Sequence, residues 1–142
     1  MKFLYGDLCV YLSIEANEMI EHWIDIANGE VSGFGIVEEI EGGFLVSKVF
    51  LPEQSCSGAN TEVEPEALAK LLMGLEESGL EPSKLKFWFH SHGDMEVFWS
   101  GTDRQTIEGI SSEDYFISLV ANKRGDYRVR VDIFRPARLV LD

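Results

Sequence analysis

Residues 85–92 have the sequence LKFWFHSH, in which an apolar run is followed by His90 and His92. The run is too apolar for a surface and predicts a buried strand that ends at the histidines. Side chains two positions apart point to the same side of a strand, so His90 and His92 are expected on one face. Asp103 follows at a distance that lets a short loop return to the same point. Two imidazoles and one carboxylate are the ligands of an open, catalytic zinc site, whose fourth position takes water.

Each of these residues also has a purely structural interpretation. Either histidine alone fits a strand-end histidine that is satisfied by hydrogen bonds. Ser100-Gly101-Thr102-Asp103 has the Ser-x-x-Asp form of a capping box, which would start a helix. Ligation and capping by Asp103 are compatible, because a ligand held at the start of a helix is well oriented.

The spacing His-x-His-x7-Ser-x2-Asp closely resembles the signature of the JAMM (MPN+, or Mov34/MPN/PAD-1) zinc metalloprotease family. That family also has an upstream glutamate after its first helix, and Glu30-Val31-Ser32-Gly33-Phe34-Gly35 stands in the matching place. The resemblance therefore covers most of the chain. Many members have proline directly after the second histidine, where this chain has Gly93. We expect the glycine to leave the following loop more mobile.

The resemblance implies a role for each residue of the motif. His90, His92 and Asp103 would bind one Zn²⁺ per chain. Glu30 would take the proton of the attacking water and pass it to the leaving amine. The Ser100 hydroxyl would donate to the oxyanion. For Ser100, helix capping alone stays an alternative.

The position of Glu30 supports its assignment as the base. It lies between a predicted helix end at residues 28–29 and an apolar strand, where a side chain reaches inward. Glu38 and Glu39 lie deeper in that strand, and Glu96 lies in the loop beside the motif. These three are weaker candidates.

Other residues near the motif are given ordinary interpretations. His22 is expected at the surface of the first helix. Phe98 and Trp99 flank Ser100 and either form a wall of the pocket or pack beneath the loop. Cys56 is expected to be an ordinary loop thiol.

The resemblance implies a zinc-dependent peptidase or isopeptidase that acts on a protein or peptide, such as the extended C-terminal tail of a ubiquitin-like protein. Two alternatives stay open: a non-catalytic interaction scaffold of the same fold, and a zinc amidohydrolase for a small amide. Segments 52–61 and 104–114 are shorter than in members that select ubiquitin chains. This is typical of a compact prokaryotic or phage-type member.

Composition limits the classes of partner. The 142 residues form one domain, and the net charge of −13 argues against nucleic-acid and anionic-membrane binding. A basic protein partner stays compatible, although the acidity is explained more simply by solubility. The two cysteines, Cys9 and Cys56, indicate reduced thiols, with one disulfide as the alternative. The N-terminal apolar stretch is interrupted by Gly6-Asp7 and lacks a signal-peptide cleavage site, so a cytoplasmic location is expected.

Hydrophobic periodicity and turn residues predict an α+β domain with a mixed, largely antiparallel curved sheet flanked by helices. This order is compatible with the fold of the JAMM family, which has a cytidine-deaminase-like architecture. The expected strands are 8–12, 31–40, 44–51, 85–90, 115–121, 127–134 and 138–141; the expected helices run from a Ser13 cap to 28–29, over 65–78, and from Ser100 or Thr102 to 111; residues 52–61 are expected to form a polar loop.

Overall fold

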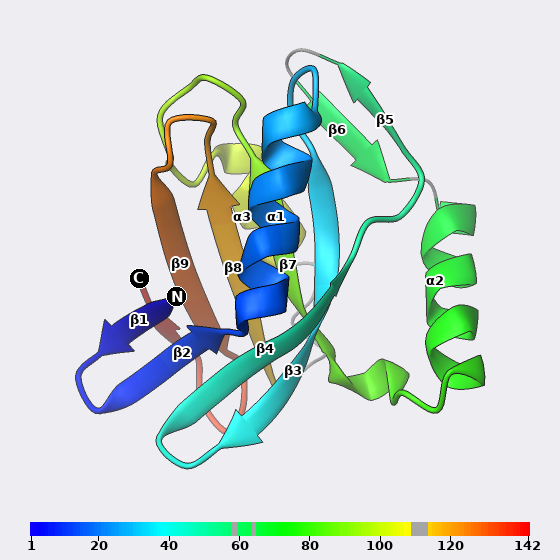
Figure 1. Ribbon diagram of the computed structural model, residues 1–142. Coiled ribbons are helices and arrows are strands. Elements are labelled where there is room, and N and C mark those ends of the chain that lie inside the picture. Colours follow the sequence, from blue (N-terminus) through cyan, green and yellow to red (C-terminus); the bar gives the residue numbers. More distant parts are fainter. Residues whose placement is uncertain (58–59, 64, 109–113) are drawn as a thin grey trace.

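The computed structural model describes residues 1–57, 60–63, 65–108 and 114–142 (Figure 1). In these ranges the chain is an α+β domain with three α-helices and an eight-stranded mixed sheet, as predicted. Its elements in chain order are β1 (Lys2–Tyr5), β2 (Leu8–Leu12), α1 (Ile14–Ile26), β3 (Ser32–Ile40), β4 (Gly43–Phe50), β5 (Gln54–Ser57), β6 (Asn60–Val63), α2 (Pro65–Glu77), the 3-10 helix η1 (Pro82–Lys84), β7 (Leu85–Ser91), α3 (Gly101–Glu108), β8 (Tyr115–Ala121), β9 (Tyr127–Ile133) and β10 (Leu139–Leu141).

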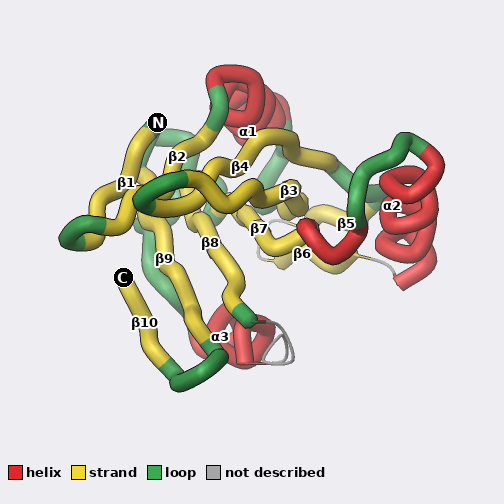
Figure 2. The backbone as a smooth tube through the Cα atoms, turned by 90° about the horizontal axis from the view of Figure 1, so that it is seen from below, coloured by secondary structure: helices red, strands yellow, loops and turns green. Residues whose placement is uncertain are grey.

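The large sheet has the strand order β1-β2-β4-β3-β7-β8-β9-β10. Strands β2 and β4 run parallel, as do β7 and β8, while the other neighbours are antiparallel. The sheet curls strongly into a half-barrel, with β8–β10 turned away from the plane of β1–β4 (Figure 2). Helices α1 and α3 lie on opposite faces of this sheet.

Helix α1 covers the main hydrophobic core. The Ser13 side chain caps it by accepting a hydrogen bond from the Ala16 backbone N–H at 3.1 Å, as the sequence predicts. Its buried face is Ala16, Ile20 and Ile24. These side chains pack against apolar residues of β2, β3, β4, β7, β8 and β9. Burial of this apolar stripe, repeating every three to four residues, holds the helix on the sheet.

Two glycines of β3 make room for the aromatic residues of β7. Gly33 pairs with Phe89 and Gly35 with Phe87. A Cβ atom at Gly33 would lie 2.3 Å from the Phe89 ring, and one at Gly35 would lie 2.8 Å from the Phe87 ring. Phe89 also stacks on Trp23 of α1, with ring centroids 5.9 Å apart. Glycine at these positions therefore lets β7 bury its aromatic side chains against α1.

The alternation of β7 decides which face carries the histidines. Phe87 and Phe89 belong to the core under α1, whereas Trp88 belongs to a second cluster on the α3 face. This second cluster also contains buried Trp99, Ile107, Phe116 and Val120. His90 follows the same two-residue period as Trp88 and stacks on its ring, with centroids 4.4 Å apart. The sheet thus presents the histidine motif to the helix that carries Asp103.

Two parts of the chain differ from the sequence prediction, and a third cannot be compared with it. Residues 2–5, given no element, form strand β1, which pairs with β2 across a turn where Gly6 has φ +62°. The predicted loop 52–61 is wrong, because β5 and β6 form an antiparallel hairpin there. Helix α3 is observed to Glu108, and its predicted end at 111 lies outside the described residues.

Further predictions concern the cysteines and membrane insertion. Cys9 is a free, half-buried thiol. The Cys56 side chain lies outside the described part of the structure, although its backbone is in β5. None of the helices in the described ranges is long and apolar enough to cross a membrane.

Candidate metal centre

The three residues predicted as zinc ligands come together on the α3 face of the sheet. His90 lies near the end of β7, His92 follows that strand, and Asp103 lies in the first turn of α3. The ligand atoms of all three lie within 4.8 Å of one another, and all three residues are buried. His90 Nε2 is 3.1 Å from His92 Nε2 and 3.1 Å from Asp103 Oδ1. His92 Nε2 is 3.6 Å from Asp103 Oδ2.

These separations fit a tetrahedral zinc ion. Zinc bonds to imidazole nitrogen and carboxylate oxygen at about 2.0–2.2 Å, so tetrahedral ligands lie roughly 3.3 Å apart. The three observed distances of 3.1, 3.1 and 3.6 Å scatter around that value. The arrangement supplies three protein ligands, which is the number that catalytic zinc sites use.

The hydrogen bond of His92 fixes its tautomer. His92 Nδ1 is 2.9 Å from the backbone carbonyl oxygen of Glu96. A carbonyl only accepts, so Nδ1 carries a proton and donates it. In neutral His92 the Nε2 lone pair is then free and points toward His90 and Asp103. Outer-shell partners of this kind orient metal-binding histidines.

His90 is held from one side by Trp88. The two rings stack at an interplanar angle of 12°, and Trp88 Nε1 donates to the Ser32 hydroxyl at 2.7 Å. Burial lowers the pKa of His90, although its hydrogen bond with Asp103 acts in the opposite direction. The neutral imidazole favoured by burial is the form that binds metals. His90 Nδ1 is buried without a hydrogen-bond partner among the described residues.

Asp103 is held by the capping box that the sequence predicts. The Ser100 N–H donates to Asp103 Oδ2 at 2.9 Å, and the Asp103 N–H donates to Ser100 Oγ at 3.1 Å. Burial alone raises the pKa of Asp103, but the hydrogen bonds from His90 and Ser100 outweigh it and hold the pKa at about 2. Asp103 is therefore an ionised carboxylate at neutral pH. The capping and ligand geometries coexist in one side chain.

Glu30 and Ser100 line the same pocket as the three candidate ligands. This pocket has a volume of about 410 Å³ and is lined by Glu30, His90, His92, Met95, Phe98, Ser100, Thr102 and Asp103. Burial raises the pKa of Glu30; nearby His92 lowers it, and Asp103 raises it further. A carboxylate with a raised pKa close to a metal site is suited to general-base chemistry. The structure thus brings together all five residues singled out in the sequence.

The weaker candidates for the base lie elsewhere. Glu38 pairs with Lys84 at 2.9 Å, toward the other end of β3. Glu39 is a neighbour of Tyr115, whose pKa it helps to raise. Glu96 is exposed and supplies its backbone carbonyl to His92. His22 is exposed on α1, as expected.

The residues around Ser100 divide between pocket and core. Phe98 is 45% exposed and makes an edge contact with His92, with ring centroids 4.7 Å apart, so it forms a wall of the pocket. Trp99 is buried and packs beneath the loop. Gly93 adopts φ +61°, a conformation closed to proline, and both its backbone groups are bonded. Its N–H donates to Ser91 Oγ, and its carbonyl accepts from the Lys123 N–H.

One structural residue near the site was missed in the sequence. Asn122 follows the predicted strand 115–121 in the connection to the next strand, and its side chain is buried. It donates to the Met95 carbonyl at 3.0 Å and accepts from the N–H groups of Arg124 and Asp126. Asn122 therefore ties the loop that follows His92 to the end of β8. The sequence shows an asparagine directly after a buried strand, but it does not show which loop the side chain holds.

A larger hollow, of about 660 Å³, lies between α1 and the β8–β9 turn. It is lined by Glu18, Glu21, His22 and Asp25 among others. Among the described residues, the group of side chains that can hold a metal is His90, His92 and Asp103, and it lies outside this hollow. The smaller pocket is therefore the better candidate site.

No protein-family model matches this chain, and no curated protein matches it by sequence. A search of solved structures finds protein DSY2949 from Desulfitobacterium hafniense, solved in solution as a structural-genomics target. The match has a TM-score of 0.67 at 12% sequence identity, and it covers 94% of this chain and 90% of that one. The likeness is one of fold.

Proposed function

We propose that this protein is a zinc-dependent hydrolase of the JAMM type that cleaves an amide bond. The observation that carries the proposal is the convergence of His90, His92 and Asp103 within 4.8 Å, in a pocket shared with Glu30 and Ser100. Their spacing in the sequence resembles that of the JAMM metalloproteases. A closed structural zinc site would call for a fourth protein ligand, usually cysteine.

His90 and His92 would hold the ion through Nε2, and Asp103 through its carboxylate. Zinc, when bound, supplies Lewis acidity and a lowered pKa for water at its open position. Glu30 would take the proton of the attacking water and later give it to the leaving amine. The raised pKa of Glu30 supports this role, because it makes the carboxylate a stronger base toward the attacking water.

Ser100 would stabilise the negative charge that develops on the carbonyl oxygen of the substrate. Its oxygen accepts the Asp103 N–H, which uses a lone pair and leaves the hydroxyl proton available to a substrate. Ser100 also lines the pocket. One donor of this type contributes roughly a hundredfold or more to turnover.

The surroundings of the pocket support an extended protein or peptide segment as substrate, such as the tail of a ubiquitin-like protein. Gln54, in the first strand of the β5–β6 hairpin, bonds both backbone groups of Ser32 at 2.8 and 2.7 Å. The hairpin therefore starts beside the strand that follows Glu30. It forms a two-stranded sheet of its own, whose outer edges suit an added strand. Met95 and Phe98 give the pocket an exposed apolar rim.

The test compares zinc-loaded wild type with Glu30→Gln on linear peptide, isopeptide-linked and small-amide substrates. Glutamine keeps the shape of the side chain and removes the base, so turnover is expected to fall by about a hundredfold or more with zinc retained. Glu96→Gln is the matched control, because it removes an exposed carboxylate from the neighbouring loop. Its turnover should stay close to that of wild type.

The pattern of substrates separates the proposal from its alternatives. Cleavage of the peptide or isopeptide substrates supports a protease, and cleavage of small amides alone would place the chain among the amidohydrolases. A zinc-loaded wild type that cleaves none of them would favour the interaction scaffold. Equal activity of Glu30→Gln and wild type would remove Glu30 from the mechanism.

A further inference from the structure

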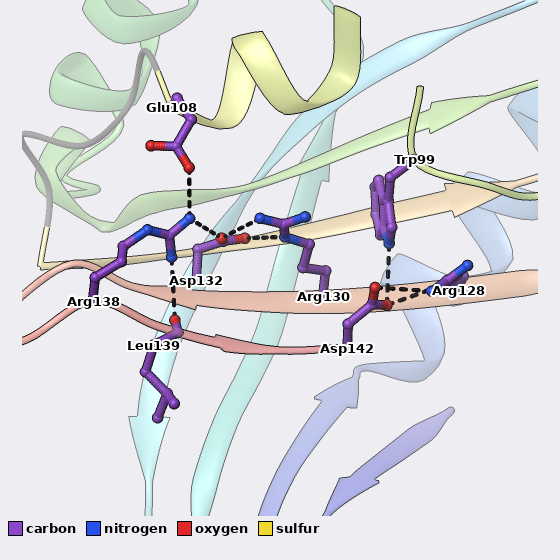
Figure 3. Close-up of polar contacts among 8 residues, drawn as sticks. All are labelled: Trp99, Glu108, Arg128, Arg130, Asp132, Arg138, Leu139 and Asp142. Atoms are coloured by element: carbon purple, nitrogen blue, oxygen red, sulfur yellow. Dashed lines mark hydrogen bonds and ion pairs between the residues drawn. The ribbon is translucent and has the colours of Figure 1, made fainter. Parts of the chain in front are cut away.

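Side chains at the two ends of strand β10 form hydrogen bonds with residues at the two ends of the segment that carries Ser100 and Asp103. It is a three-residue edge strand paired only with β9 in the large sheet. Arg138 precedes it and Asp142 follows it. Figure 3 shows Asp142 reaching Trp99, just before α3, and Arg138 reaching Glu108, the last residue of α3. We call Arg138 and Asp142, with these contacts, the β10 clamp.

At the start of α3 the clamp acts on Trp99. Trp99 is buried, and its Nε1 donates to Asp142 Oδ1 at 3.1 Å. Arg128 of β9 holds the same carboxylate through two hydrogen bonds of 2.9 Å each. Bidentate arginine–carboxylate pairs fix the carboxylate in direction as well as in position. Trp99 directly precedes Ser100, so this contact bears on the start of the capping box.

At the other end of α3 the clamp acts on Glu108. Arg138 Nη2 lies 2.7 Å from Glu108 Oε1 and 2.7 Å from Asp132 Oδ1. Asp132 is fully buried in β9 and is also held by Arg130 through two hydrogen bonds of 2.8 Å (Figure 3). The Arg138 guanidinium further lies over the Phe134 ring, 4.6 Å from its centroid. Arg138 thus ties the end of α3 to a buried charge in the sheet.

Helix α3 needs such support. It has eight residues in the described part of the chain, and helices shorter than about 12 residues are marginal in water without tertiary contacts. Within α3 itself, Asp103 and Ile107 are its buried residues. Asp103 must keep its carboxylate within reach of His90 and His92, which stand on the sheet. Support at both ends of the helix therefore bears on the geometry of the metal centre.

We propose that Arg138 and Asp142 are positioning residues for the metal centre. They hold α3 on the sheet so that Asp103 and Ser100 meet the two histidines. The expected effect on metal binding rests on the proposed function, whereas the expected effect on helix α3 does not depend on it.

The test uses Arg138→Gln and Asp142→Ala singly, so that each variant keeps the other half of the clamp. The zinc dissociation constant is measured by competition with a chelator, well below the unfolding temperature. We expect each variant to bind Zn²⁺ about tenfold more weakly than wild type, the scale for loss of an outer-shell support. Arg135→Gln is the matched control, because it removes an exposed arginine charge from the same turn. Its dissociation constant should stay within about twofold of wild type.

Two further readouts separate positioning from general destabilisation. The Co²⁺-substituted variants should show altered visible absorption bands, because the ligand geometry changes while the ligands stay. In the metal-free protein, amides of residues 101–108 should exchange with solvent about tenfold faster, with β7 and β8 unchanged. If Arg138→Gln or Asp142→Ala does not fold, Arg138→Lys and Asp142→Asn replace them, with the same expected directions.

If the α3 amides of the variants exchange as slowly as those of wild type, the clamp is overturned, whatever the zinc affinities are. Faster exchange with unchanged zinc affinity and cobalt spectrum would overturn its positioning role. If wild type binds neither metal, the proposed zinc function fails, and the proposal that the clamp positions a metal centre fails with it; the exchange data then decide only whether β10 holds α3.

Discussion

Ser100 and Asp103 satisfy each other's backbone N–H groups. The Ser100 N–H donates to Asp103 Oδ2 at 2.9 Å, and the Asp103 N–H donates to Ser100 Oγ at 3.1 Å. Asp103 Oδ1 is left to face His90 at 3.1 Å. One capping box therefore starts α3, orients a candidate metal ligand and fixes the hydroxyl proposed to hold the oxyanion.

The two roles of Ser100 separate in Ser100→Ala. Loss of a cap costs roughly 1 kcal/mol of the free energy of unfolding. Loss of an oxyanion donor lowers turnover by about a hundredfold or more, with substrate binding nearly intact. We expect both effects, measured by urea unfolding and by steady-state kinetics on the same sample. A lowered stability with turnover preserved would assign Ser100 to capping alone.

Ser13→Ala provides the control for that experiment. Ser13 caps α1 in the same way, by accepting from the Ala16 N–H at 3.1 Å. It lies outside the pocket that contains Glu30 and Ser100. The variant should lose about as much stability, roughly 1 kcal/mol, and keep wild-type turnover.

Glu30→Gln is expected to stabilise the metal-free protein at neutral pH. Burial raises the pKa of Glu30, so folding favours its protonated form. A carboxyl group whose pKa is raised by folding leaves the free energy of unfolding at its full value below the unfolded pKa. That contribution to the free energy of unfolding is lost as the pH rises through the folded pKa. At pH 7 the ionised carboxylate therefore weakens the fold, and glutamine removes that cost. The gain over wild type should disappear near pH 3, more than about one unit below the ordinary glutamate pKa of about 4.3, because the Glu30 carboxyl is then protonated in both the folded and the unfolded protein.

Urea unfolding of the two metal-free proteins at both pH values checks this sign. Glu96→Gln, an exposed carboxylate in the neighbouring loop, serves as the control. A Glu30→Gln protein less stable than wild type at pH 7 would show that the carboxylate makes favourable contacts instead.

Local patterns were enough to predict that the two histidines share a face of the sheet and that the candidate ligands come together. The run LKFWF followed by His-Ser-His places Trp88 and His90 on one face and Phe89 on the other, and the structure has this alternation. The Ser-x-x-Asp spacing predicted the capping box that is observed. Both features depend on residues only two or three positions apart, where the geometry of a strand or a helix start fixes the outcome.

Features that depend on long-range contacts were not predicted. Arg138 meets Glu108 across 30 residues and Asp132 across six, and no periodicity links them. The hairpin β5–β6 has polar strands, and Gln54 ties it to the backbone of Ser32, 22 residues earlier. Strand β1 is an exception with a local signal, because the turn at Gly6-Asp7 separates two apolar runs that pair as β1 and β2.

Asn122 is expected to contribute strongly to stability. In Asn122→Ala the Met95 carbonyl and the N–H groups of Arg124 and Asp126 lose their partner. Buried polar groups without a partner cost about 1–3 kcal/mol each, and partial access to water lowers the total. We therefore expect the free energy of unfolding to fall by about 1–3 kcal/mol in urea titrations. Asn28→Ala, at an exposed asparagine, should change it by less than about 0.5 kcal/mol. A near-neutral Asn122→Ala would mean that water replaces these bonds.

The central claim is that His90, His92 and Asp103 bind zinc. The most direct measurement is the zinc content per chain after loading and removal of free metal, for wild type, His90→Ala, His92→Ala and His22→Ala. His22 is an exposed histidine on α1 and controls for adventitious binding. We predict about one zinc per chain in wild type and His22→Ala, and close to none in the other two. Wild type without zinc, or equal zinc in His92→Ala, would contradict the account.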